Sequence, residues 1–151
     1  GTIHDKMMVL GANLLVTTLT KLITHTLVEK EQETIINEDP SLLKHAPKIF
    51  TETCTIDWHN STDSIYNLIR GLSPFPGALT KLDDKILKIF ESSKEICSHT
   101  NKIGSVSSDS KTYLKFAAAD GYIHVLDLQL EGKKRMQVAD FLRGYKINTG
   151  H

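Results

Sequence analysis

The sequence predicts a mixed α and β chain, mainly β: a small antiparallel barrel with flanking helices, preceded by a long N-terminal helix and a linker. The barrel is predicted because short apolar segments follow one another closely between residues 78 and 130, a spacing typical of such barrels. Asp120-Gly121 stands between two apolar runs and favours a two-residue hairpin turn, in which both positions need positive φ. Apolar residues at helical spacing towards both ends of the chain predict the helices.

The composition limits the classes of protein to which the chain can belong. Its 151 residues suffice for one domain, or for a small domain with an attached piece, and 40% hydrophobic residues can fill a core. The formal net charge is +0, so binding to nucleic acid or membrane would need locally segregated charge. Cys54 and Cys97 lie far apart and are expected to be reduced thiols in a cytoplasmic protein. We find no uninterrupted apolar run of membrane-spanning length and no signal peptide, and we expect no membrane partner.

Residues 1–28 are predicted to form one helix, from about Ile3 to about Leu27. Thr2 can cap it, and Asp5 lies three residues on, where a carboxylate also favours the helix dipole. The apolar face is broad and needs a partner surface, which suggests that the chain is a fragment of a longer protein. The apolar residues at this spacing are Ile3, Met7, Leu10, Leu14, Leu15, Leu19, Leu22 and Ile23.

Residues 29–55 are predicted to be a linker. The stretch 29–39 contains five acidic residues and one basic residue, and Pro40 and Pro47 interrupt regular structure. Thr34-Ile35-Ile36 is expected to be a short extended piece. The acidic run itself is typical of a solvated face.

Residues 56–151 are predicted to be the barrel domain. Asn60 or Ser61 can cap a helix that ends near Gly71, and Trp58 just before the cap can act as a hydrophobic staple. Asp83-Asp84 is a plausible hairpin turn, and Gly104 suggests a bulge or bend. The apolar-rich segments expected to form strands are 78–82, 85–91, 94–98, 103–106, 114–119 and 122–130.

The closing part of the chain combines a polar turn with a short helix. Residues 131–135 form the turn, and it carries three cations in a row. Val138, Phe141 and Leu142 then recur at helical spacing, with Gly144 expected just beyond the helix end, at C′.

The sequence contains no catalytic or metal-binding pattern. None of its seven histidines occurs in HExxH or beside cysteines at zinc spacing, and there is no phosphate-binding glycine loop or GxSxG nucleophile. His124 alternates with leucines along a predicted strand, so we expect a partly buried structural histidine. We therefore assign no catalytic, cofactor-binding or metal-binding residues.

Charge placement is the positive signal. Residues 131–146 contain five bases and two acids, and further lysines at 81, 85 and 88 flank the first hairpin, where Asp83 and Asp84 offset them. Cationic loops on a small barrel can hold a nucleic-acid backbone, because phosphate contacts are electrostatic. Lysines in a turn are also common as plain solvated surface, and Arg70 can simply cap the last carbonyls of its helix. Both interpretations remain open from the residues alone.

Several stretches resemble the methionyl-tRNA formyltransferase family. IYNLIRGLSPFPGA at 65–78 and DGYIHVLDLQLEGKKRMQVADFLRG at 120–144 are similar to its C-terminal domain, as is Ile56-Asp57-Trp58. GTIHDKMMVLGANLL at 1–15 resembles the last helix of the catalytic domain, and Ala46-Pro47-Lys48-Ile49 resembles the end of the linker. The resemblance extends over nearly the whole chain in the same order.

The resemblance implies an OB-like C-terminal domain that binds initiator methionyl-tRNA, joined to an N-terminal catalytic domain that is the chain's other expected partner. That catalytic domain would use 10-formyltetrahydrofolate, and its Asn, His and Asp groups have no counterpart here, so the chain alone should be inactive and bind no cofactor. The neutral charge and the acidic linker depart from the family pattern. The alternative is a structural or substrate-side domain of another 10-formyltetrahydrofolate-dependent formyltransferase or hydrolase that binds no RNA. Charge placement and resemblance together nominate as nucleic-acid-binding residues Lys48, Arg70, Lys133, Lys134, Arg135 and Arg143.

Overall fold

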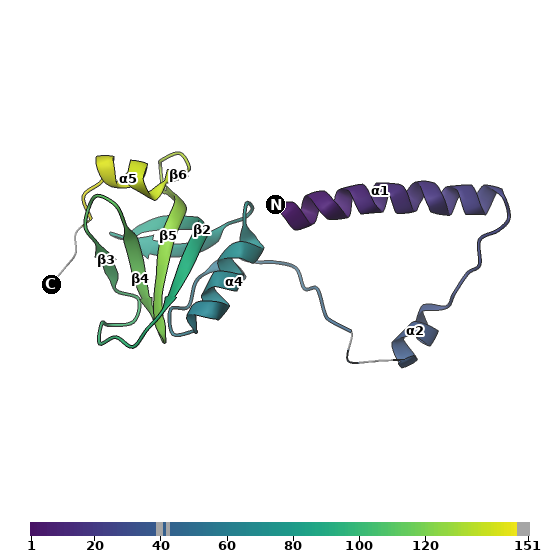
Figure 1. Cartoon of the computed structure of the whole chain (residues 1–151), viewed down its shortest axis with the longest axis horizontal. Coiled ribbons are helices and arrows are strands. Elements are labelled where there is room, and N and C mark those ends of the chain that lie inside the picture. The colour runs from purple at the N-terminus through teal and green to yellow at the C-terminus, as the bar shows by residue number, and fades with distance from the viewer. Residues whose placement is uncertain (39–40, 42, 148–151) are drawn as a thin grey trace. The chain divides into compact units, whose positions relative to one another are not determined.

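The computed structural model describes residues 1–38, 41 and 43–147, and it divides into two compact units, Gly1–Lys48 and Ile49–His151 (Figure 1). The first unit contains α1 (Thr2–Ile23) and α2 (Gln32–Glu38). The second contains the strands and three further helices. We describe each unit by itself.

Helix α1 is present as predicted, with different ends. Its N-cap is Gly1, with no side-chain cap, so the predicted capping role of Thr2 is wrong: Thr2 already lies inside the helix. The helix ends at Ile23 because the chain turns back there, with the amides of Thr26 and Leu27 donating to the Lys21 carbonyl and a positive φ at His25. None of its residues is buried, so its apolar face is exposed in this structure.

Helix α1 is also long and apolar enough to cross a membrane, with a mean hydropathy of 1.3 over its most apolar window. This qualifies the expectation that the chain lacks a segment of spanning length. Length and hydropathy alone are weak grounds for a membrane span, because the core helix of a soluble protein can share both. The apolar run is interrupted by Asn13 and by threonines, several of which donate their hydroxyls to carbonyls four residues earlier.

Helices α2 and α3 (Thr51–Cys54) lie within the segment predicted as a linker. The expectation of an extended piece at 34–36 is wrong, because these residues are helical. The Thr34 amide and hydroxyl both bond the Glu31 carbonyl at the start of α2, at 3.2 and 2.7 Å. Glu33 in the first turn complements the helix dipole.

The second unit is a curled antiparallel sheet that forms a half-barrel, as Figure 1 shows, and the predicted mixed, OB-like fold class is confirmed. The strand order is β1-β2-β5-β4-β3, with the short β6 paired to the far part of β5. The strands are β1 (Ala78–Leu82), β2 (Lys85–Ile96), β3 (Val106–Ser108), β4 (Leu114–Ala118), β5 (Gly121–Leu130) and β6 (Met136–Gln137).

Strand β2 is one long strand where the sequence predicted two segments, 85–91 and 94–98. The polar residues between them continue to pair with β5, and the register shifts on both sides of Glu91. Such bulges bend a strand and increase its twist, which lets the sheet curl. The segment predicted as a strand at 103–106 instead contains a bend with a positive φ at Gly104, and β3 starts at Val106. Strand β6 was not predicted.

The two predicted hairpins are present, and one turn is displaced. Asp83 and Asp84 both have positive φ, as a type I′ turn requires. In the second hairpin Ala118 pairs with Gly121, so the turn residues are Ala119 and Asp120 rather than Asp120 and Gly121. Gly121 is needed for another reason: a Cβ there would lie 2.0 Å from the Glu95 carbonyl oxygen on β2.

Helices α4 (Thr62–Leu72) and α5 (Val138–Gly144) pack against the sheet and contribute to its core. Ser61 caps α4 as predicted, accepting the Ser64 amide. Gly144 is the last residue of α5 and not its C′ residue, since the chain becomes extended at Tyr145. The largest fully buried side chains are Phe116, Phe141, Ile65, Ile69, Leu87, Ile89, Leu114, Ile123, Leu128 and Leu130.

Trp58, predicted as a hydrophobic staple of α4, packs on the sheet. Its ring stacks on Phe116 with centroids 4.6 Å apart, and its indole N–H donates to the Thr80 hydroxyl at 3.0 Å. The indole therefore joins the segment before α4 to strands β1 and β4.

Candidate nucleic-acid interface

The polar turn between β5 and β6 is held at its first residue by the neighbouring strand. The Glu131 amide donates to the Ile86 carbonyl at 2.8 Å, and the Glu131 carboxylate accepts the Ile86 amide at 3.1 Å. Gly132 has a φ of 77°, and a Cβ there would meet nothing within 4 Å, so the positive φ and not crowding favours glycine. The Lys133 amide closes the turn on the Leu130 carbonyl at 2.9 Å.

Lys133 and Lys134 project from this turn, and both are exposed. Within the described residues neither ammonium has a hydrogen-bond or ion-pair partner. Free, exposed ammonium groups on a fixed turn can contact an anion without first breaking an internal ion pair.

Two lysines of the first hairpin lie on the same face of the sheet as this turn. Strand register pairs Lys88 with Gln129 on β5. It pairs Lys81 with Ile86, two residues before Lys88, so Lys81 and Lys88 are diagonal neighbours on one face of the sheet. The side-chain Nε2 of Gln129 donates to the Lys133 backbone carbonyl at 2.9 Å, which folds the turn back towards Lys88. We call Lys81, Lys88, Lys133 and Lys134 the lysine cluster.

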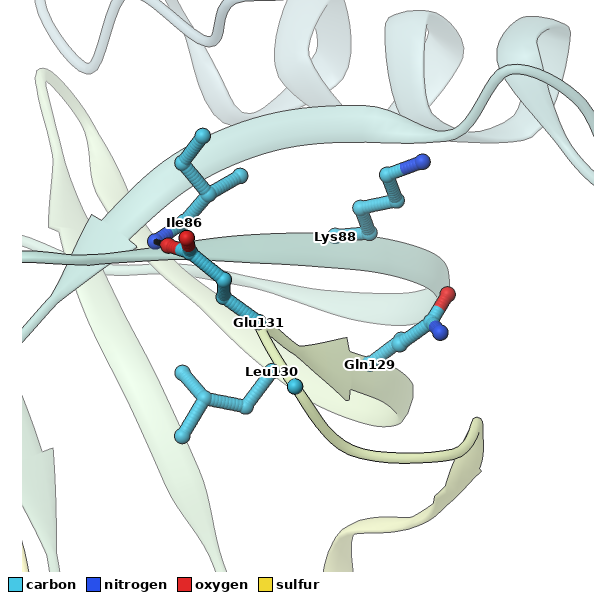
Figure 2. Close-up of a pocket in the computed structure, with 6 residues that line it drawn as sticks. Ile86, Lys88, Gln129, Leu130 and Glu131 are labelled. Carbon is cyan, nitrogen blue, oxygen red and sulfur yellow. Dashed lines mark hydrogen bonds between the residues drawn. The ribbon is translucent and has the colours of Figure 1, made fainter.

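A shallow hollow of about 210 Å³ lies beside Lys88 and the first residues of the turn. Figure 2 shows the Lys88 and Gln129 side chains on one side of the strands, while Leu130 points to the opposite side, into the core. The hollow is lined by Ile86, Lys88, Gln129, Leu130, Glu131 and Gly132. The hollow is small and open, so it suits a surface contact better than an enclosed ligand.

Two of the acidic residues near the cluster, Asp83 and Glu131, already have hydrogen-bond donors. The Asp83 carboxylate accepts the Tyr145 hydroxyl at 2.8 Å, and Glu131 accepts the Ile86 amide. Burial and this contact with Asp83 raise the pKa of Tyr145 above its usual value of 10.0. The phenol therefore stays protonated and keeps donating to Asp83 at neutral pH.

The other basic residues predicted to bind nucleic acid are placed differently. Arg135 donates from Nε and Nη2 to Asp127, and Arg143 pairs with Asp140 on its own helix. Arg70 donates to the Asn67 side chain at 3.1 Å, and not to the last carbonyls of α4. Lys48 is exposed and belongs to the first unit. Of the six predicted residues, the structure brings together Lys133, Lys134 and Arg135 in one turn.

The sequence showed that Lys81 and Lys88 flank the first hairpin, but it did not predict that they lie near the β5–β6 turn. The alternation of β5 could have indicated that Gln129 faces outward. The pairing of β2 with β5, which makes Lys88 its neighbour, carries no local sequence signal.

The opposite end of the sheet carries a second group of charged side chains. His124 Nε2 lies 2.6 Å from the Glu95 carboxylate, and Lys115 Nζ lies 3.3 Å from the same oxygen. These two partners lower the pKa of Glu95 below its usual 4.5, the hydrogen bond from His124 contributing most. His124 is partly buried, as predicted.

No group of three potential metal ligands from His, Cys, Asp and Glu occurs in the described part of the chain. Cys54 and Cys97 are both unpaired thiols, as expected.

Comparisons with known proteins identify the family of the chain. A family model described as formyl transferase, C-terminal domain, matches residues 48–146. A methionyl-tRNA formyltransferase of Phocaeicola vulgatus is 47% identical over 99% of this chain and 47% of its own length. Those of Bacteroides thetaiotaomicron and Citrifermentans bemidjiense are 40% and 38% identical over 99% of the chain, with 47% and 44% of their own lengths covered.

Among solved structures, a variant of HypX from Aquifex aeolicus superposes with a TM-score of 0.52 at 20% identity, over 77% of this chain and 23% of that one. This similarity supports the fold alone. The chain spans about half the length of the curated relatives it matches. The family match over most of the chain and the identities to these relatives show that the chain belongs to the formyl transferase C-terminal domain family.

Proposed function

We propose that the chain is the tRNA-binding, C-terminal part of a methionyl-tRNA formyltransferase. Such an enzyme formylates the methionine of initiator tRNA for translation initiation in the cytoplasm, with 10-formyltetrahydrofolate as co-substrate. The observation that carries the RNA-binding role is the lysine cluster, in which Lys133 and Lys134 have no partner among the described residues. A chain of net charge +0 needs such a local concentration of cations to attract a polyanion.

In this proposal residues 1–28 are the last helix of the catalytic domain, 29–55 connect it to the barrel, and 56–151 bind tRNA. The exposed apolar face of α1 supports the first assignment, since such a face needs a partner surface. Folate binding and catalysis belong to the part of the enzyme that this chain does not span. The chain alone is therefore expected to be inactive and to bind no cofactor or metal.

The lysine cluster would hold the tRNA backbone through its phosphates. Lysine ammonium groups act as point charges, so these contacts would fix the position of the RNA without reading its bases. Lys48, Arg70 and Arg143 remain predicted contacts. The pairing of Arg143 with Asp140 makes it a weaker candidate than Lys133 and Lys134.

The test is the salt dependence of initiator tRNA binding by the 151-residue chain. Wild type should bind at low salt and lose affinity steeply as salt rises. K133A/K134A should weaken binding about equally for different RNA sequences. It should also lower the logarithmic salt slope by about 0.7–0.9 for each phosphate that is no longer neutralised.

The matched control is K111A, which removes an exposed lysine from the loop between β3 and β4 and should leave the slope unchanged. No binding by wild type at low salt would overturn the proposal. An effect of K111A half as large as that of K133A/K134A would show that only total charge matters, because the single variant removes one cation and the double variant removes two.

The neutral charge and the acidic stretch 29–39 favour a second candidate, a structural or substrate-side domain of another formyltransferase or hydrolase that binds no RNA. This candidate predicts no tRNA binding at any salt concentration. The same titration therefore separates the two functions.

A further inference from the structure

Arg135 stands beside Lys133 and Lys134 but has a different environment. Its Nε and Nη2 atoms both donate to Oδ2 of Asp127, at 2.9 and 2.7 Å. Its guanidinium carbon lies 4.3 Å from the centre of the Phe90 ring, which is within the range of a cation–π contact. Arg135 is therefore held at two points by the sheet.

Both partners of Arg135 are themselves fixed. Asp127 is on β5 and only 7% exposed, and Phe90 is on β2 and also 7% exposed. The backbone at Gly77 approaches Phe90 so closely that a Cβ there would lie 2.9 Å from the ring. The ring and the carboxylate thus form a rigid binding site for the guanidinium.

These two contacts of Arg135 attach the C-terminal end of the 131–135 turn to the sheet. Arg135 directly precedes β6, whose Gln137 pairs with Asp127, while Glu131 fastens the near end to Ile86. Lys133 and Lys134 lie between these two attachments. The contact of Arg135 with Asp127 thus adds a side-chain attachment at this end to the backbone pairing of β6 with β5.

Release of Arg135 to an RNA phosphate would be costly. Asp127 Oδ1 is buried and has no hydrogen-bond partner within the described structure, so Oδ2 and its arginine are what stabilise this carboxylate. Removing the arginine would leave a buried charge without a counter-ion. The guanidinium is thus better suited to hold the turn than to bind a ligand.

We propose that Arg135 is a positioning residue, which fixes the Lys133–Lys134 turn for RNA binding through Asp127 and does not itself contact the RNA. The proposal rests on the proposed function, because it assigns a role at the same site. It also replaces the expectation from sequence that Arg135 contacts nucleic acid directly.

The decisive variant is D127N, measured for initiator tRNA affinity in the 151-residue chain. By charge alone, the loss of an acid near the cluster should strengthen binding to a polyanion. A positioning role predicts the opposite, a loss of about tenfold, as expected for coupled residues. The amide oxygen of asparagine can still accept from Arg135 but carries no charge, and its NH2 group would replace Oδ1, which is buried without a partner in the described structure. Asp84→Asn is the matched control: it removes an acid from the first hairpin, and asparagine tolerates the positive φ there, so it should bind equally well or tighter.

Arginine variants provide the second arm, which also holds if D127N folds poorly. R135K keeps the charge but cannot make the two-pronged contact, so it should weaken binding about as much as R135A. The double variant R135A/D127A should be no weaker than R135A, because both residues act through one contact. R135K binding like wild type, with D127N binding like D84N, would overturn the proposal.

A readout without RNA separates this proposal from the proposed function. Hydrogen exchange of the Lys133 amide should be faster in R135A and D127N than in wild type, while the Thr62 amide, far along the chain in α4, should be unchanged. Unchanged exchange at Lys133 would overturn the positioning role while tRNA binding by wild type stands. If wild type binds no tRNA, the proposed function fails, and the role of Arg135 in RNA binding fails with it.

Discussion

Removal of the Asp120 carboxylate tests how the barrel holds helix α4. Asp120 Oδ1 accepts the Thr62 amide at 2.7 Å, across 58 residues of sequence, while the local cap Ser61 accepts the Ser64 amide at the longer distance of 3.3 Å. Thr62 is fully buried, so its amide would be left without a partner in D120A. Because the Asp120 contact is shorter and its loss leaves a buried donor without a partner, D120A should lower the free energy of unfolding more than S61A does.

The expected magnitude is the cost of leaving the buried Thr62 amide without a partner. That cost is about 1–3 kcal/mol, so we expect D120A to lower the free energy of unfolding by about 2 kcal/mol. For a unit of this size, 1 kcal/mol shifts the melting temperature by about 4–8 °C, so D120A should melt roughly 10 °C lower.

The assay is urea denaturation followed by circular dichroism, with thermal melting alongside. D120N is the control, because its amide oxygen can still accept the Thr62 amide, so it should retain most of the stability. A midpoint for D120A within error of wild type would refute the reasoning. An equal loss in D120N would show that the negative charge near the helix N-terminus matters, and not the hydrogen bond.

Two further variants test the sheet. G121A should strongly destabilise or unfold the chain in thermal melting, because the new Cβ would lie 2.0 Å from the Glu95 carbonyl oxygen; a melting temperature like wild type would contradict that close approach. E95Q should destabilise at neutral pH, and the difference from wild type should vanish as pH falls. The sign follows because His124 and Lys115 lower the pKa of Glu95, so its stabilisation is present above the unfolded value of 4.5 and is lost as pH falls through the folded pKa; a difference that grew towards acid pH in urea titrations would contradict this.

Much of the fold could be predicted because its signals are local. The Asp83-Asp84 turn, the Ser61 cap of α4 and the paired runs around Asp120 each depend on a few adjacent residues. The continuity of β2 could not be predicted, because its middle residues are polar. They stay in the strand by pairing with β5 through a bulge, and that pairing has no local sequence signal. The two-residue β6 is too short to show alternation.

The candidate site was only half predictable for the same reason. A lysine turn is visible in the sequence, and so Lys133 and Lys134 could be nominated. The partner of Arg135 depends on strand register: Asp127 lies eight residues earlier, and Phe90 comes from another strand. From composition alone, a bound arginine and a free lysine look alike.

The lysine cluster is proposed to contact the backbone of initiator tRNA. Hydrogen exchange of the 151-residue chain, measured with and without initiator tRNA at low salt, tests it most directly. We predict protection in segments 86–88 and 129–134, absent in K133A/K134A, with the β3–β4 loop at 109–113 unchanged. Protection confined to that loop, or no protection anywhere at saturating tRNA, would contradict the claim.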